Sequence, residues 1–123
     1  MGYDIHIVRT NHWLHASENP ITKEQIDVVL EKDNELSWSQ EDYVDMKDEL
    51  GQVTRYFAIN WKGIPCFWWY KDQIKCSNPS QEQVIKMAEI SKALGAKLIG
   101  DDGETYDVKK NVFGKLRVVQ KQP

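Results

Sequence analysis

The chain has 123 residues, a formal net charge of −3 and a hydrophobic content of 41%, which fits one domain with one core and is too short for two. No stretch approaches the ~20 apolar residues of a membrane helix, and residues 1–8 lack the basic leader and apolar region of a signal peptide, so we expect a cytoplasmic protein. Residues 1–108 carry 19 acids against 11 bases, while residues 109–123 carry five bases and no acid, so the main domain should repel nucleic acid and attract basic partners.

The first predicted elements are a strand and a helix. Residues 3–9 alternate with period two, which is typical of a strand that has one apolar face. Thr22 and Gln25 have the spacing of a capping box, so we predict a helix over residues 23–32.

The middle of the chain begins with an acidic segment. Residues 31–49 contain eight acids and two lysines, with aromatic and aliphatic side chains between them. Strands are then predicted over residues 52–61, 66–70 and 74–76. In residues 66–70 the side chains directed to both faces of the strand are apolar, which favours a place in the middle of the sheet.

The second half of the chain has the clearest helix signals. Pro79 and Ser80 predict a helix start, and Gly95 predicts a left-handed C-terminal cap. A return strand over residues 96–100, an acidic turn at 101–104 and a final strand within 112–119 follow. We therefore predict an α+β fold with a mainly antiparallel sheet of four to six strands and two helices packed on it, in the order β-α-β-β-β-α-β(-β). Residues 1–108 should form a single α+β domain, with 109–123 as a basic C-terminal extension that holds a terminal strand and a frayed tail.

The chain has two cysteines, Cys66 and Cys76, and their spacing fits neither a CxxC metal site nor a disulfide framework. They could face each other if they flank a strand-turn unit. In a reducing compartment we expect both to be buried free thiols.

Enzyme signatures are missing: the sequence has no GxSxG, P-loop, dinucleotide fingerprint or HExxH motif. We therefore predict a protein that is not an enzyme and has no cofactor. One alternative is a metal site or a small metal-dependent enzyme, with Asp101-Asp102 as a further ligand pair. Its N-terminal candidates are Asp4, His6, His12 and His15.

Acidic and aromatic residues provide the candidate binding surface. Trp and Tyr are enriched at interaction hot spots, and an acidic rim around such an anchor suits a basic protein. Core packing and a solvated charged face are the competing interpretations. The predicted partner-binding residues are the acids Glu41, Asp42 and Asp45, the anchors Trp38, Tyr43 and Trp69, and a second patch of Asp101, Asp102 and Glu104.

Two blocks of sequence carry a resemblance. The first block is the opening run Tyr3-Asp4-Ile5-His6-Ile7-Val8-Arg9 with Trp13. The second runs from Lys75 through Tyr106 and contains Asn78-Pro79, Ala93-Leu94-Gly95-Ala96 and Gly100-Asp101-Asp102-Gly103-Glu104-Thr105-Tyr106; the two blocks cover about a third of the chain. Together they resemble a family of small uncharacterised bacterial proteins. In size, acidity and α+β character the chain is also similar to immunity proteins of polymorphic toxin systems.

This resemblance in character implies an immunity-type protein that binds and blocks a basic toxin domain, such as a nuclease. Carboxylates would take the place of the phosphates of the toxin's substrate, while an aromatic residue supplies buried area. The alternatives are the metal-binding protein above and an interaction domain that forms a homodimer through its aromatic face.

Overall fold

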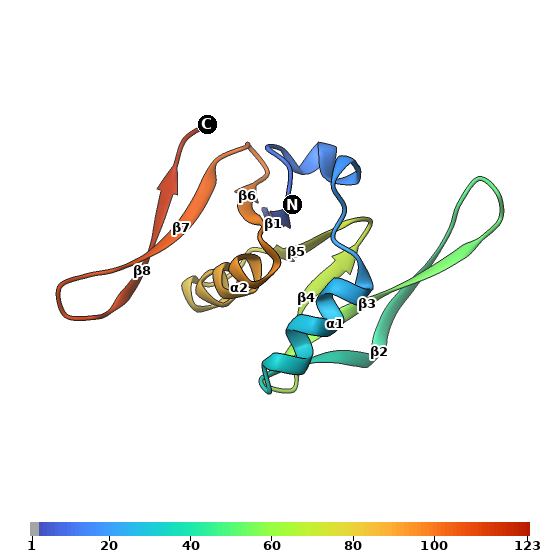
Figure 1. Cartoon of the computed structure of the whole chain (residues 1–123), viewed down its shortest axis with the longest axis horizontal. Coiled ribbons are helices and arrows are strands. Elements are labelled where there is room, and N and C mark those ends of the chain that lie inside the picture. The colour runs from blue at the N-terminus through green and yellow to red at the C-terminus, as the bar shows by residue number, and fades with distance from the viewer. Residues whose placement is uncertain (1–2) are drawn as a thin grey trace.

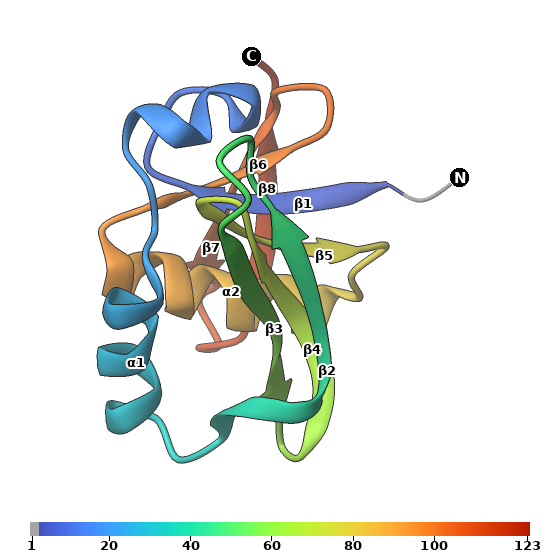
Figure 2. The same ribbon diagram turned by 90° about the vertical axis from the view of Figure 1, so that its right-hand side faces the viewer.

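The computed structural model describes residues 3–123, which form one open sheet of eight antiparallel strands in the order β2-β3-β4-β5-β1-β6-β7-β8. Helices α1 and α2 lie against one face of this sheet (Figures 1 and 2). The predicted α+β class is confirmed. The helical elements are η1 (Trp13–Glu18, a 3-10 helix), α1 (Lys23–Lys32) and α2 (Gln81–Leu94); the strands are β1 (Asp4–Val8), β2 (Leu36–Lys47), β3 (Val53–Trp61), β4 (Ile64–Tyr70), β5 (Gln73–Ser77), β6 (Lys97–Gly100), β7 (Thr105–Lys110) and β8 (Leu116–Lys121).

Both predicted helices begin where their capping residues indicate, and α2 also ends at its predicted cap. Thr22 and Gln25 form the capping box of α1, and Ser80 and Gln83 form that of α2. Gly95 ends α2 at φ 63° and ψ 39°, a left-handed conformation that glycine adopts without steric cost. These signals are local in sequence, so tertiary contacts do not override them.

The main core lies between the helices and the sheet. The alternation of β1 directs Ile5 and Ile7 towards the helices, while His6 and Val8 point to the opposite face. Part of that opposite face is covered by η1, where Trp13 and Ala16 pack with Val8 and Ile99. The largest fully buried side chains are Phe67, Ile7, Ile21, Ile26, Ile59, Ile74, Met87, Ile99 and Val8.

The sheet has two more strands than the upper predicted number, because β2 and β7 were not expected. Residues 39–42 of β2 lie opposite Ala58 alone, and this bulge interrupts the two-residue alternation that identifies a strand. Acidic residues also have low strand propensity. Residues 36–47 of the acidic segment nevertheless form an edge strand of the sheet.

The basic C-terminal segment is part of the same sheet. The change of charge near residue 108 falls inside β7, and β7 pairs with β8 along its whole length. Val112 and Phe113 were expected in the final strand but lie in the turn before it, 93% and 86% exposed. The charge change therefore marks a basic hairpin and not an appended tail. No helix among residues 3–123 is long and apolar enough to cross a membrane.

Candidate functional site

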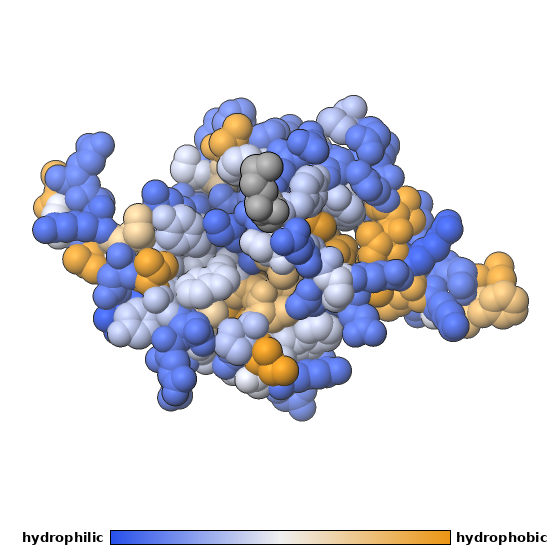
Figure 3. Space-filling view, turned by 180° about the vertical axis from the view of Figure 1, so that it is seen from behind, coloured by the Kyte–Doolittle hydropathy of each residue, from blue (hydrophilic) through white to orange (hydrophobic). Residues whose placement is uncertain are grey.

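The first candidate site is the acidic hairpin, which we define as β2, β3 and the turn between them, residues 36–61. It projects from one end of the molecule, and the β7–β8 hairpin projects from the other (Figure 1). The end of the β7–β8 hairpin carries a group of hydrophobic side chains, whereas the end of the acidic hairpin is mainly hydrophilic with isolated hydrophobic side chains (Figure 3). In the acidic hairpin these are Leu50 and Val53, which are 88% and 62% exposed.

The bulge in β2 presents two of the predicted carboxylates. The Ser39 hydroxyl donates to the carboxylate of Asp42 (2.9 Å) and accepts from the Asp42 amide (3.0 Å). Ser39 is buried, whereas Glu41 and Asp42 are exposed. The buried serine thus fixes a turn that leaves both acids on the free edge of the sheet.

Arg55 organises the next two predicted residues. Its guanidinium donates to both carboxylate oxygens of Asp45, at 2.8 and 3.0 Å, and lies 3.9 Å from the ring centroid of Tyr43. The hydrogen bonds from Arg55 hold the pKa of Asp45 below its usual range. Tyr43 stays 44% exposed. Arg55 was not predicted as a site residue. It lies two residues before Phe57 in the predicted strand, and alternate strand residues share a face of the sheet, so the sequence does place these two side chains on one face.

The two predicted tryptophan anchors have different positions. Trp38 is half-buried, and its indole N–H donates to Asp27 of α1 at 2.7 Å. Trp69 is 8% exposed and donates to the carbonyl of Ile21, so it belongs to the core and its predicted role as a surface anchor is wrong. Neighbouring strand residues point to opposite faces, and it is Trp68 that lies on the face away from the helices.

The predicted second patch does not form a continuous acidic surface. Glu104 is 2% exposed; it accepts hydrogen bonds from the hydroxyl of Tyr106 (2.8 Å) and the amide of Asp102 (3.1 Å). Burial, followed by the bond to Glu104, raises the pKa of Tyr106. Asp102 is exposed and Asp101 is half-buried, so Glu104 has a structural role in the turn.

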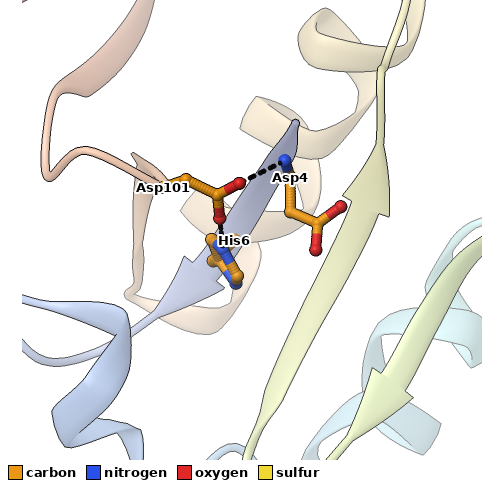
Figure 4. Close-up of side chains that lie close together, drawn as sticks. All are labelled: Asp4, His6 and Asp101. Carbon is orange, nitrogen blue, oxygen red and sulfur yellow. Dashed lines mark hydrogen bonds and ion pairs between the residues drawn. The ribbon is translucent and has the colours of Figure 1, made fainter. Parts of the chain in front are cut away.

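The second candidate site is the His6 cluster, which comprises Asp4, His6, Trp13, Gln73 and Asp101 (Figure 4 shows Asp4, His6 and Asp101). His6 is 3% exposed, and its ring is stacked on Trp13 with the centroids 4.7 Å apart. Its Nε2 lies 2.8 Å from Asp101 Oδ1, and its Nδ1 lies 2.6 Å from Gln73 Oε1. Either a doubly protonated ring, or a neutral ring with the Gln73 amide turned over, satisfies both contacts.

Asp101 connects this cluster to the end of β1. Its second carboxylate oxygen accepts the amide of Asp4 at 2.8 Å, and its backbone carbonyl accepts the Trp13 indole N–H at 3.2 Å. Desolvation would raise the pKa of Asp101, but the hydrogen bonds from Asp4 and His6 outweigh it and lower the pKa. The carboxylate is therefore held in its charged form beside the buried imidazole.

Two of the four N-terminal metal-ligand candidates, Asp4 and His6, come together with Asp101. Asp4, His6 and Asp101 each offer a ligand atom, and these atoms lie within 4.8 Å of one another. His12 accepts the amide of Leu14, and the His15 side chain is 66% exposed; neither belongs to this group. Each of the three converging side chains already has a hydrogen-bond partner, since Asp4 accepts from Ser77 at 2.6 Å. The cluster thus forms a satisfied polar network, in which a metal would have to replace existing hydrogen bonds.

Comparisons with known proteins give no match: no family model, curated protein or solved structure is similar to this chain. The resemblance to small bacterial proteins and to immunity proteins stays a prediction.

Proposed function

We propose that the chain is an immunity-type protein, which binds and blocks a basic toxin domain through the acidic hairpin. The observation that supports this proposal is the composition of a free sheet edge. Residues 36–61 carry five acids against two bases, and the edge strand β2 holds Glu41, Asp42 and Asp45. An edge strand also offers unpaired backbone groups to a partner.

The hairpin combines the two properties that a protein-binding surface needs. Its carboxylates steer a positively charged partner towards it. Its exposed Tyr43, Leu50 and Val53 supply apolar area that the partner can cover. Because Arg55 already neutralises Asp45, the uncompensated charge comes mainly from Glu41, Asp42, Asp48 and Glu49.

Binding kinetics test the proposal. The full chain is measured by biolayer interferometry against a panel of purified basic nuclease toxin domains, at low and high salt. If a toxin gene lies beside the gene for this chain, its product is the first partner to test. We expect binding to at least one domain, with inhibition of its nuclease activity and an association rate that falls as salt rises.

A charge-reversal variant and a matched control locate the surface. The variant E41K/D42K/D45K should associate about tenfold or more slowly at low salt. The control E18K/E31K/E82K changes the net charge equally at exposed sites outside the hairpin, and its association should slow much less. Equal slowing of both variants, or no binding across the panel, would contradict the proposal.

The convergence of Asp4, His6 and Asp101 favours a second candidate function, a metal-binding protein. Elemental analysis of the purified chain and calorimetric titration with zinc test it. A stoichiometric metal that Asp101→Asn abolishes would support this function. Protein without metal, and no heat of binding, would leave the cluster as structural.

A further inference from the structure

Cys66 and Cys76 lie on the neighbouring strands β4 and β5, at the side of the sheet that faces α2. Both are free thiols, Cys66 half-buried and Cys76 only 5% exposed. Trp68 pairs with Lys75, and the next position of the same antiparallel register places Phe67 opposite Cys76. Cys66 is the residue just before Phe67. The two cysteines therefore occupy diagonal positions on neighbouring strands.

A bulge in β4 explains why the two thiols meet. Ile59 pairs with Phe67 but Asn60 pairs with Pro65, so Cys66 is an extra residue without a partner on β3. A bulge redirects the side chain of the extra residue. Both Phe67 and Cys66 therefore contact the main core, although adjacent residues of a regular strand point to opposite faces.

The N-terminus of α2 supplies a second group to Cys66. The Gln83 amide donates from Nε2 to Cys66 Sγ at 3.2 Å. The orientation of this amide is fixed by the capping box, because its Oε1 accepts the amide of Ser80 at 2.8 Å. Its N–H group is thus aimed at the sulfur, in the first turn of a helix, where negative charge is favoured.

The two thiols have different roles in this environment. The neighbouring Cys76 thiol is the largest influence on the pKa of Cys66; with the hydrogen bond from Gln83 it outweighs burial and lowers that pKa. The same pairing raises the pKa of Cys76, and burial adds to the rise. A thiolate is the attacking species in thiol–disulfide exchange, so Cys66 is the nucleophile and Cys76 the resolving thiol.

We propose that Cys66 and Cys76 form a redox-active pair that reacts with a small disulfide, such as oxidised glutathione, to give an internal disulfide between β4 and β5. The Cys66 thiolate attacks one sulfur of oxidised glutathione, which forms a mixed disulfide and releases one glutathione thiolate. Cys76 loses its proton and attacks the Cys66 sulfur, which releases the second glutathione thiolate. Two protein thiols are oxidised, one small disulfide is reduced, and the two protons pass to the two glutathione molecules.

Intact-mass spectrometry of the full chain, incubated with oxidised glutathione at neutral pH, tests the pair. We expect the mass to fall by two hydrogens, both thiols to become unreactive towards maleimide in denaturant, and a reductant to reverse both changes. Peptide mapping should place the bond between Cys66 and Cys76. A native chain that keeps two free thiols, or that forms only bonds between molecules, would overturn the proposal.

Single variants separate the two roles. Cys76→Ser should stop at the mixed disulfide and carry one glutathione on Cys66, while Cys66→Ser should stay unmodified because Cys76 is buried. In the Cys76→Ser background, Gln83→Met should slow adduct formation several-fold. Ser80→Ala serves as the control, since it also breaks the capping box but keeps the Gln83 donor. Equal modification of the two cysteine variants would contradict the assigned roles.

Discussion

The ammonium of Lys86 lies 2.6 Å from the carboxylate of Asp33, which connects α2 to the C-terminal cap of α1. Glu35 and Glu89 also accept from Lys86, each at 3.2 Å. The Lys86 side chain is 5% exposed, whereas the three carboxylates are partly open to solvent. One buried cation thus links the connection between α1 and β2 to α2.

We expect Lys86→Met to lower the free energy of unfolding by about 1–3 kcal/mol. Removal of one partner of a buried ion pair leaves the other unpaired, but these carboxylates can regain water, so the loss is below that of a fully buried pair. Urea unfolding measures the change. Lys92→Met, at an exposed position of the same helix, is the control; an equal loss in both variants would remove the special role of Lys86.

The same group predicts how stability depends on pH. The hydrogen bond from Lys86 lowers the pKa of Asp33, so its contribution is present above the unfolded pKa, about 3.9, and is lost as pH falls through the lower folded pKa. For Lys86, desolvation would lower the pKa, but the bonds to Asp33, Glu35 and Glu89 raise it. That contribution is complete below about 10.4 and is lost as pH rises through the higher folded pKa.

We therefore expect the difference in unfolding free energy between the native chain and Lys86→Met to shrink roughly between pH 5 and pH 2. This is the range over which paired carboxylates become protonated and cease to stabilise the folded state. Urea midpoints at a series of pH values measure it. A difference that stays constant down to pH 2 would show that packing of the Lys86 stem, and not its charge, stabilises the fold.

Gly100 allows a close approach that no other residue permits. A Cβ at this position would overlap the carboxylate of Glu104 and the hydroxyl of Tyr3. We expect Gly100→Ala to cost about 2 kcal/mol, because the buried site must move to accept the added carbon. Thermal and urea unfolding measure this loss. An unchanged midpoint would mean that the Glu104 side chain can swing away at no cost.

Asp101 and Asp102 are adjacent, but we expect their substitution by alanine to change the free energy of unfolding by different amounts. Asp101→Ala removes the acceptor of both His6 Nε2 and the Asp4 amide, which should cost about 1–3 kcal/mol of unfolding free energy. Asp102→Ala affects an exposed carboxylate with no ion pair among the described residues and should be close to neutral. Similar losses in both variants would indicate that the turn itself, and not the His6 cluster, is sensitive.

The helix caps could be predicted because their signals lie within a few residues of each other. Contacts that depend on strand pairing could not. His6 and Asp101 are 95 positions apart and meet only because β1 pairs with β6. The side of the sheet on which Trp69 lies likewise depends on the strand register. The approach of Cys66 to Cys76 depends on that register and on the bulge in β4, and no local sequence pattern specifies either of them.

Asp45 and Arg55 provide the sharpest test of the acidic hairpin as a binding surface. Asp45→Asn and Arg55→Gln break the same ion pair, so a merely structural role predicts the same direction of change in binding. Electrostatic steering predicts opposite directions, because the first variant makes the hairpin less negative and the second makes it more negative. Against a basic nuclease toxin domain at low salt, we expect slower association for Asp45→Asn and faster association for Arg55→Gln. The two rates should converge at high salt, where the charges are screened, and a shift of both rates in one direction at low salt would argue against steering by this edge.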